Sequence, residues 1–531
     1  MCLVIFYQTI IIIMHIDARE LDNNSFIEGD ICIVGAGAAG ISIALEFMNS
    51  PYKVILLEGG GFQYEERIQE LYNGKTTGQP YYPLKSAELH YFGGTTGHWG
   101  GMCSLFDPIA FQKREWVELS GWPITQNDLL SHYKRAHINL DIDGFDFSAS
   151  SWQKKDSSLV PLPLDNSVVW NKIWRFSPPT RFGQKYKDTI INAKNIHLYT
   201  YANVVDLNAN ADISKVQSVM VKNYTGKTHT VKAKKFVLAC AGIQNARLLL
   251  ASNKQAPKGL GNNNDLVGRY FMEHLEIKSA ELWLKKESAL KLYMINYPIV
   301  QAELAVTPGK QAEYKILNGI VSLTPSEIAR KTPPFIKIWS NEDPRENEKQ
   351  VREVYKIAPE DLMTRIKNHI SGKKNEHQAF ELTIRLEQAP NPLSRITLSS
   401  GKDELGMPRA ALNWAFTSLE KKSILKIYEI IGQQVGAAGI GRVKLKDDIL
   451  DGDEKSVPAS TSGGWHHMGT TRMNNDPKFG VVDENCKIHG IDNIYIAGSS
   501  CFPTGAGVNP TLTIVAMSIR LADHLKEVIK L

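Results

Sequence analysis

Two histidines and an asparagine in the C-terminal part of the chain are the residues best suited to chemistry. His466 and His467 are adjacent, and Gly469 and Thr470 follow them closely. Asn509 stands further on, directly before a proline and a threonine. Histidine has an ordinary pKa near neutrality, whereas an amide donates hydrogen bonds and does not titrate in this range. The segments that hold these residues therefore predict proton chemistry.

A glycine motif near the N-terminus predicts a dinucleotide site beside which this chemistry could take place. An apolar run, residues 31–34, precedes Gly35, Gly37 and Gly40 in the spacing G-x-G-x-x-G. The first glycine permits a tight turn, the second lets a pyrophosphate approach the backbone, and the third allows the next helix to pack closely. An apolar stretch after Gly40 predicts that helix, whose N-terminal N–H groups favour a phosphate.

An acidic residue completes the dinucleotide motif. A second apolar run, residues 54–57, ends at Glu58, where a carboxylate accepts hydrogen bonds from ribose hydroxyls. The glycine spacing alone is weak, but here strand, glycines, helix, strand and acid occur in order. The acid favours an unphosphorylated ribose, and therefore FAD or NAD over NADP. This segment does not separate FAD from NAD.

Length and composition indicate a soluble protein of two or more domains. The chain has 531 residues, of which 43% are hydrophobic and 22% are charged. A net charge of +5, without a basic cluster interleaved with aromatic residues, argues against a nucleic-acid-binding protein. The six scattered cysteines form no C-x-x-C pair, so we expect reduced thiols, no metal site and a cytoplasmic location.

The apolar stretch at residues 3–14 does not match a membrane or export signal. It is too short to span a bilayer and lacks the positive residues that begin a signal peptide. A translation start at Met14 would account for it. No other run approaches transmembrane length, so we expect no integral membrane span.

The pattern of the sequence changes between about residues 271 and 456. Before this region, residues 236–242 are typical of a buried strand that ends in a glycine turn, and a helical pattern follows. Within it, alternating runs such as residues 380–386 and 395–398 predict strands with one polar face, as in an antiparallel sheet. A helical pattern at residues 421–431 lies between such runs.

These patterns predict a discontinuous dinucleotide-binding domain and an inserted domain. We assign residues 14–270 and 457–531 to the first and residues 271–456 to the second. A final helix is expected from about Leu512 to Ile529.

Together, these segments resemble the glucose-methanol-choline (GMC) oxidoreductase family of FAD enzymes. The resemblance covers nearly the whole chain. It implies an α/β fold (α+β overall), with a split Rossmann-type FAD-binding domain and an inserted substrate domain built on an antiparallel sheet. The segments that carry it are residues 35–40, 93–101, 236–250 and 266–274, and the chain from His466 onward, including 480–483, 488–490, 493–498 and 509–513.

The resemblance also assigns roles to the C-terminal residues. In such enzymes a histidine in an H-x-x-G-T setting takes the proton of an alcohol while hydride passes to flavin N5. The spacing places this role on His466, with His467 as the alternative one position away, and Asn509 is the partner residue. His274 and His489 are expected to be ordinary core histidines.

Further residues are implied as contacts of the FAD. Some family members attach the flavin covalently through a histidine in the glycine-rich loop, and we expect His98 to do so here; a non-covalent FAD is the alternative. The implied cofactor-binding residues are Gly35, Gly37, Gly40, Glu58, Gly94, Thr95, His98, Trp99, Val204, Gly242, Gly498, Ser499, Asn509, Pro510 and Thr511.

The expected substrate is a sugar, glycoside or other polyol. Segments after His98 and Trp99, including Asp107-Pro108 and Gly121-Trp122-Pro123, resemble the branch of pyranose oxidases and fructose dehydrogenase-like subunits. The expected electron acceptor is oxygen, a quinone or a cytochrome. The alternatives are a non-sugar alcohol dehydrogenase or oxidase, a non-redox lyase on the same FAD scaffold, and a noncatalytic FAD-binding subunit.

Overall fold

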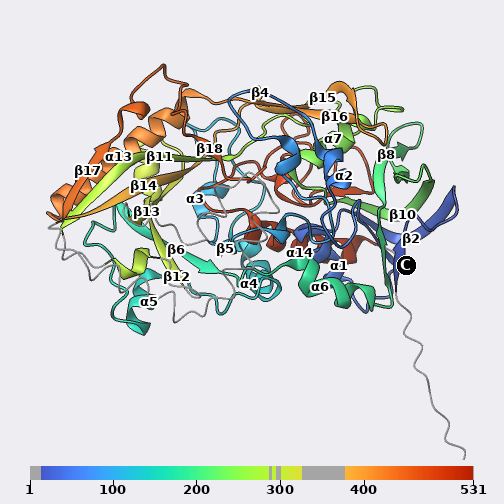
Figure 1. The fold of residues 1–531 in the computed structure, drawn as a ribbon, viewed down its shortest axis with the longest axis horizontal. Coiled ribbons are helices and arrows are strands. Elements are labelled where there is room, and N and C mark those ends of the chain that lie inside the picture. Colours follow the sequence, from blue (N-terminus) through green and yellow to red (C-terminus); the bar gives the residue numbers. More distant parts are fainter. Residues whose placement is uncertain (1–13, 286–289, 295–299, 326–376, 530–531) are drawn as a thin grey trace, which may run out of the picture.

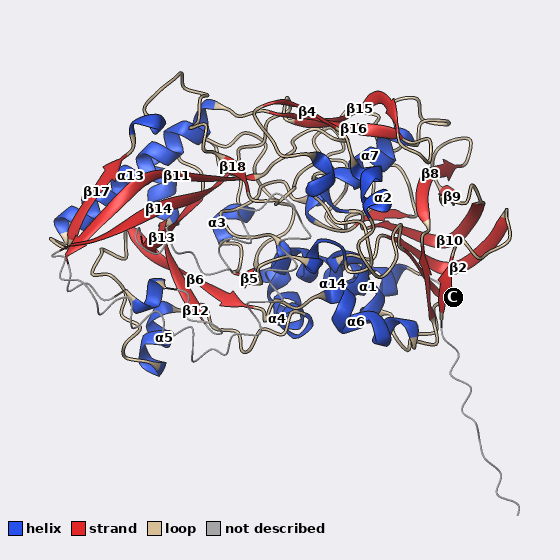
Figure 2. Ribbon diagram, in the orientation of Figure 1, coloured by secondary structure: helices blue, strands red, loops and turns tan. Residues whose placement is uncertain are grey.

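Three sheets and the helices packed on them form the part of the protein that the computed structural model describes (Figures 1 and 2). The structure describes residues 14–285, 290–294, 300–325 and 377–529. The apolar stretch at residues 3–14 lies outside these residues, apart from Met14. None of the helices among the described residues is long and apolar enough to cross a membrane.

The first sheet carries the predicted dinucleotide motif. Its strand order is β1-β7-β3-β2-β10-β9-β8, with β19 paired to β10, and all neighbours are parallel except β10-β9 and β9-β8. The strands are β1 His15–Asp17, β2 Ser25–Val34, β3 Val54–Leu57, β7 Ile196–Thr200, β8 Asn203–Ala209, β9 Val216–Lys222, β10 Thr228–Leu238 and β19 Ile494–Ile496.

Helices cover the first sheet because the buried ends of its central strands are apolar. The last four residues of β2 and all of β3 are buried, as expected for strands with both faces covered. Helix α1 (Ala38–Glu46) contacts α14 (Thr511–Val528), which contacts α4 (Leu130–Asn139); α6 (Phe182–Ile191) lies beside α1 (Figure 1). Helix α7 (Ala241–Ala251) follows β10 and contacts β8. The predicted strand-helix-strand unit, the helix after residues 236–242 and the final helix are confirmed.

The second sheet lies at the other end of the molecule (Figure 2) and is antiparallel, as the alternating run at residues 380–386 predicted; the run at residues 395–398 belongs to the third sheet. Its order is β17-β11-β14-β13-β12-β6-β5, with β18 paired to β11. The strands are β5 Met102–Cys103, β6 Val169–Phe176, β11 His274–Lys285, β12 Val300–Val306, β13 Gly319–Pro325, β14 His377–Glu387, β17 Gly441–Leu445 and β18 Ser462–Gly463. Helix α13 (Ser418–Ala437) contacts this sheet, and its Ile427 lies against Gly319 of β13.

Strands from both predicted domains share sheets. Strands β5 and β6 lie outside residues 271–456 but join the second sheet. In a third sheet, β15 (Arg395–Lys402) and β16 (Pro408–Trp414) of the inserted region pair with β4 (Lys75–Gly78) of the N-terminal region. The domain boundaries therefore stay a prediction, and the two regions are joined through hydrogen-bonded strands.

Shorter helices complete the described structure. The α-helices are α2 Glu66–Gln69, α3 Pro108–Phe111, α5 Ala149–Lys155 and α8 Pro308–Tyr314; the 3₁₀ helices are η1 Glu70–Tyr72, η2 Leu84–Ser86, η3 Gly94–Gly97, η4 Asn127–Leu129, η5 Lys291–Tyr293, η7 Asp447–Ile449 and η8 Ser499–Cys501.

Candidate functional site

Each glycine of the N-terminal motif is required for a different structural reason. Gly35 ends β2 with φ +101°, a conformation that a side chain would strain. A Cβ on Gly40 would come 1.9 Å from the carbonyl oxygen of Gly35, so only glycine lets α1 lie this close to the strand. A Cβ on Gly37, by contrast, would meet no atom within 4 Å. Gly37 therefore borders open space, as the approach of a pyrophosphate requires.

Glu58 is fixed at the end of β3 by two backbone donors. The N–H of Ala36 donates to Oε2 and the N–H of Gly60 donates to Oε1, each over 3.0 Å. Burial raises the pKa of Glu58, although these N–H donors stabilise the charged form. Each carboxylate oxygen keeps acceptor capacity, so Glu58 can accept a ribose hydroxyl while it holds the glycine loop.

Two adjoining cavities form a long cleft at the ends of β2 and β3. The first encloses about 970 Å³ of empty space and the second about 600 Å³, open solvent at their mouths included, and both are lined by Gly35, Glu58, Tyr72 and Cys240. Of the predicted cofactor-binding residues, the first cavity is lined by Gly35, Gly37, Glu58, Gly94, Thr95, Trp99, Gly242, Gly498, Ser499, Pro510 and Thr511.

The remaining predicted residues lie elsewhere. Val204 lines the second cavity, and Gly40 serves the packing of α1. His98 and Asn509 are not among the residues that line either cavity. Asn509 directly precedes Pro510, the N-cap of α14; its Oδ1 is buried and makes no hydrogen bond to any described residue.

The cleft has the chemical features that a dinucleotide such as FAD needs. The first residues of α1 and α14 line it, so the N-terminal N–H groups of two helices favour a negatively charged pyrophosphate. Gly498 has φ +108° and, like Gly37, no atom within 4 Å of an added Cβ. Glu58 lines both cavities, and its carboxylate can accept a hydrogen bond from a ribose hydroxyl. The residues present therefore fit FAD.

His466 lines the cleft and makes a ring-to-ring contact with His274. Its Nδ1 lies 2.9 Å from Nδ1 of His274. Within the described residues, no hydrogen bond involves its Nε2. Burial, together with nearby positive groups, holds the pKa of His466 well below its ordinary value, so the ring is neutral at neutral pH. A neutral ring beside the cleft can accept a proton.

A buried carboxylate holds the backbone on both sides of this contact. Oε1 of Glu273 accepts the N–H of His274 over 3.0 Å and the N–H of His466 over 2.6 Å. Oε2 accepts the hydroxyls of Tyr81 and Tyr82 over 2.7 and 2.9 Å. Glu273 thus joins β11 to the loop that carries His466.

His467 is held in a different electrostatic environment. Its Nδ1 lies 2.9 Å from Oε1 of Glu88, and its Nε2 lies 3.7 Å from Oε2 of Glu273. Burial lowers the pKa of His467, but the hydrogen bond and charge of Glu88 outweigh burial and raise it overall. The ring is therefore tied to carboxylates, whereas His466 is neutral. This difference favours His466 over His467 as a base.

The ring of His98 is neutral, and its Nδ1 makes no hydrogen bond to a described residue. Burial lowers the pKa of His98 to about 4. The next residue, Trp99, donates from Nε1 to the carbonyl oxygen of Thr180 over 3.0 Å, which fixes the loop. The covalent attachment at His98 stays a prediction.

A row of charged side chains lies on the second sheet behind His466. Arg385 of β14 donates from Nε to Oε1 of Glu276 on β11 over 3.0 Å, and its Nη1 lies 3.6 Å from Oε2 of Glu303 on β12. Trp174 of β6 also donates to Oε2 of Glu303, over 2.7 Å. A Cβ on Gly464 would lie 2.7 Å from Nδ1 of His466 and 3.5 Å from Oε1 of Glu276, so this charged row begins beside the histidine.

Sequence reasoning did not identify Glu273, His274 and this charged row as parts of the site. His274 was expected to be an ordinary core histidine, yet its ring contacts His466. In the alternating run of residues 380–386, Arg385 occupies an ordinary position on the predicted polar face. The pattern therefore does not distinguish it from a solvent-exposed arginine, and it names no partner.

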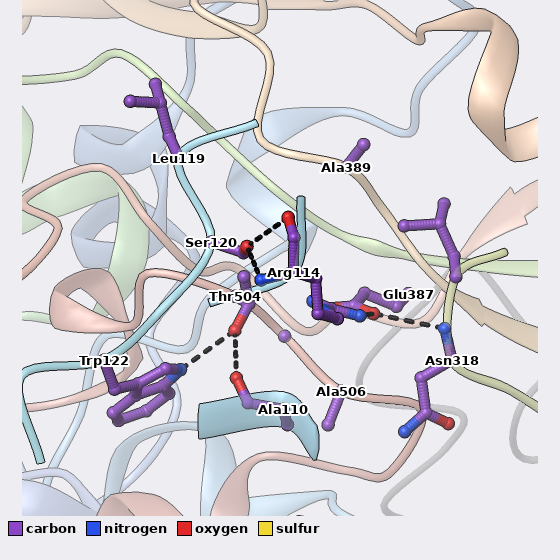
Figure 3. Close-up of polar contacts among 12 residues, drawn as sticks. Ala110, Arg114, Leu119, Ser120, Trp122, Asn318, Glu387, Ala389, Thr504 and Ala506 are labelled. Atoms are coloured by element: carbon purple, nitrogen blue, oxygen red, sulfur yellow. Dashed lines mark hydrogen bonds and ion pairs between the residues drawn. The ribbon is translucent and has the colours of Figure 1, made fainter. Parts of the chain in front are cut away.

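The ion pair between Arg114 and Glu387 supports the site from behind (Figure 3). Both side chains are almost fully buried, and the pair is bidentate with two 2.7 Å contacts. Glu387 of β14 is paired in register with His274 of β11. The pair therefore fixes the end of β14 at the level of His274.

The sequence is similar to those of known oxidoreductases. Residues 390–518 match the family model described as GMC oxidoreductase. The 2-methyl-1,2-propanediol dehydrogenase of Mycolicibacterium austroafricanum is 24% identical over 93% of this chain and 95% of its own. The fructose dehydrogenase large subunit of Gluconobacter japonicus is 21% identical over 95% of this chain and 98% of its own.

A solved structure of formate oxidase from Aspergillus oryzae has the same fold. It superposes with a TM-score of 0.53 at 16% identity and covers 96% of this chain and 99% of its own. The family model, relatives aligned over nearly the whole chain, the shared fold and the cleft all point to one assignment. Residues 390–518 carry the match to the glucose-methanol-choline (GMC) oxidoreductase family, and the chain is an FAD-dependent oxidoreductase.

Proposed function

We propose that the protein oxidises an alcohol to a carbonyl compound, with His466 as the base that takes the hydroxyl proton. When bound, FAD supplies the hydride acceptor, flavin N5. The observation that carries the proposal is the neutral ring of His466 at the cleft, with no hydrogen bond to Nε2 among the described residues. The hydroxyl proton goes to this nitrogen, and the carbon-bound hydrogen leaves as hydride.

Asn509 is proposed to orient the alcohol. An amide N–H can donate a hydrogen bond to the substrate oxygen without changing its protonation state. Asn509 lies directly before Pro510, which lines the cleft, and its buried Oδ1 accepts no hydrogen bond from a described residue, so none of these residues fixes the orientation of the amide through that oxygen.

The substrate is proposed to be a sugar, glycoside or other polyol. The charged row of Glu276, Arg385 and Glu303 lies close to His466, and carboxylates and a guanidinium hydrogen-bond readily to several hydroxyls at once. Relatives named for fructose and for a diol support a hydroxyl-rich substrate. The diol relative equally supports the alternative of a small non-sugar alcohol. The proposed acceptor of the electrons is oxygen, a quinone or a cytochrome.

An anaerobic screen of the flavin absorbance tests this function. The holoenzyme is mixed with sugars, glycosides, diols and simple alcohols, and reduction is read as bleaching of the oxidised flavin band. We expect bleaching by at least one hydroxyl-rich compound. If a compound is converted without any bleaching, the protein is instead a lyase on this scaffold. If none of these alcohols bleaches the flavin, alcohol oxidation is the wrong reaction class.

We also propose that His98 carries a covalent bond to the flavin. The neutral ring and its unpaired Nδ1 support a nucleophilic histidine in the glycine-rich loop. Acid precipitation of the holoenzyme should leave the yellow colour in the pellet, and His98→Ala should release it to the supernatant. Colour that is wholly in the supernatant of the wild-type protein excludes the bond.

A further inference from the structure

The contact between His274 and His466 has a direction that the surrounding acceptors determine. Nε2 of His274 lies 3.2 Å from the carbonyl oxygen of Gly505 and 2.9 Å from that of Ala506. A carbonyl oxygen can only accept a hydrogen bond. Nε2 of His274 therefore carries a proton and donates it to this loop.

The position of that proton determines the next one. A neutral imidazole has one protonated and one unprotonated nitrogen, so Nδ1 of His274 has a free lone pair. Nδ1 of His466 lies 2.9 Å from this unprotonated Nδ1 of His274, so the N–H of His466 must donate the hydrogen bond. A neutral His466 with its proton on Nδ1 has an unprotonated Nε2, which is the form that a base needs. With both rings neutral, the chain of hydrogen bonds from the carbonyl groups through His274 to His466 allows no other placement of the ring protons.

The backbone acceptors are held in place by buried contacts (Figure 3). Thr504 donates to the carbonyl oxygen of Ala110 over 2.7 Å and accepts from Nε1 of Trp122 over 2.9 Å. A Cβ on Gly507 would lie 2.9 Å from Oδ1 of Asn318 and 3.0 Å from Cγ1 of Ile320, so the loop lies tightly against the start of β13. The carbonyl groups at 505 and 506 are thus fixed on both sides.

We propose that His274 is a positioning residue, which fixes the tautomer of His466 so that Nε2 is the unprotonated nitrogen. His274 acts through His466 and is not assigned a contact with substrate or cofactor. The proposal rests on the proposed role of His466 as the base. It adds that the backbone carbonyls of Gly505 and Ala506, through His274, determine which nitrogen of that base is available.

The electrostatic surroundings support neutral rings on both residues. Burial lowers the pKa of His274 to about 4, and burial also lowers the pKa of His466. The positive charge of Arg385 acts on both rings in the same direction. At neutral pH neither ring carries a second proton that would make the tautomer undefined.

A pair of variants of similar size separates this role from simple packing. Leucine and asparagine have nearly the same shape, but only asparagine can place an acceptor oxygen where Nδ1 of His274 lies. In His274→Leu the buried N–H of His466 loses its acceptor, so the ring favours the other tautomer. We expect flavin reduction to slow about 10- to 100-fold, the effect of leaving a buried donor unpaired. In His274→Asn the rate should stay close to that of the wild-type holoenzyme.

A spectroscopic measurement tests the tautomer without relying on turnover. In holoenzyme labelled with ¹⁵N-histidine, protonated and unprotonated ring nitrogens have well-separated shifts, and the His466 signals are those missing in His466→Gln. We expect a protonated Nδ1 and an unprotonated Nε2 in the wild type, and the reverse in His274→Leu. A protonated Nε2 in the wild type overturns the proposal, even if neither His274 variant folds.

The kinetic outcomes also distinguish the two proposals. Equal losses in His274→Leu and His274→Asn would mean that His274 only fills space, and a wild-type rate in His274→Leu would mean that it has no role. Either result removes the inference and leaves the function intact. If His466→Ala itself reduces its flavin at the wild-type rate, the proposed function fails instead.

Discussion

Removal of Arg114 should destabilise the protein far more than removal of an exposed arginine. Arg114 and Glu387 are 1% and 0% exposed and make two 2.7 Å contacts, and the N–H of Asn318 also donates to Glu387 over 3.2 Å. In Arg114→Met the Glu387 carboxylate stays buried without its counterion. Loss of one member of a buried pair costs about 3–5 kcal/mol. We expect the free energy of unfolding to fall by that amount.

The assay is denaturant unfolding of the holoenzyme, followed by intrinsic fluorescence and by flavin release. Arg67→Met is the matched control, because Arg67 pairs with Glu404 at the surface, where both side chains are at least half exposed. Surface pairs contribute about 0–1 kcal/mol. The double variant Arg114→Met/Glu387→Met should lose much less stability than the two single variants added together, since no charge is left unpaired. A cost in Arg114→Met as small as that in Arg67→Met would refute this account of the pair.

Three further predictions concern the cleft and its histidines. Gly37→Val should fold but lose FAD, because its new side chain occupies the open space where the pyrophosphate approaches. Gly40→Ala should instead reduce stability, because its Cβ would lie 1.9 Å from a carbonyl oxygen. Flavin content and thermal unfolding measure the two effects separately, and retained FAD in Gly37→Val would contradict the first. The pKa of His466 is lowered, so its neutral form persists below pH 6.5. The rate of flavin reduction after a pH jump should therefore stay constant as the pH falls through 6.5. A loss of half of this rate near pH 6.5 would indicate a histidine with an ordinary pKa. The pKa of His274 is about 4 in the folded protein, whereas the same histidine in the unfolded chain binds a proton below about pH 6.5. The free energy of unfolding should therefore fall by roughly 3 kcal/mol between pH 6.5 and pH 4. His274→Asn should flatten the plot of unfolding free energy against pH in this range, and an unchanged slope would count against a buried neutral ring.

Local sequence signals predicted the elements that surround the cofactor cleft. Gly35, Gly37 and Gly40 with Glu58 marked β2, α1 and β3 because a phosphate-binding turn needs those residues within one short segment. For α13, the helical pattern at residues 421–431 predicted only the middle of the helix; the capping box of Thr417 and Glu420, which marks its start, is a local signal that this pattern does not include.

The contacts around His466 could not be read in this way because they join distant segments. His274 and His466 are 192 positions apart and meet only because β18 pairs with β11, which places Gly463 opposite Leu275. Their proton arrangement depends in turn on a backbone carbonyl at Ala506. For the same reason β5 and β6 joined the second sheet unpredicted: short strands do not identify their neighbours.

The most direct test of the central claim is the rate of anaerobic flavin reduction in His466→Ala with a substrate that bleaches the wild-type flavin. His197→Ala is the control, because His197 lies on β7 and does not line the cleft. A general base contributes about 10²- to 10⁴-fold, so reduction in His466→Ala should slow by that factor, with FAD still bound and the control unchanged. Reduction of His466→Ala at the wild-type rate would contradict the assignment of His466 as the base.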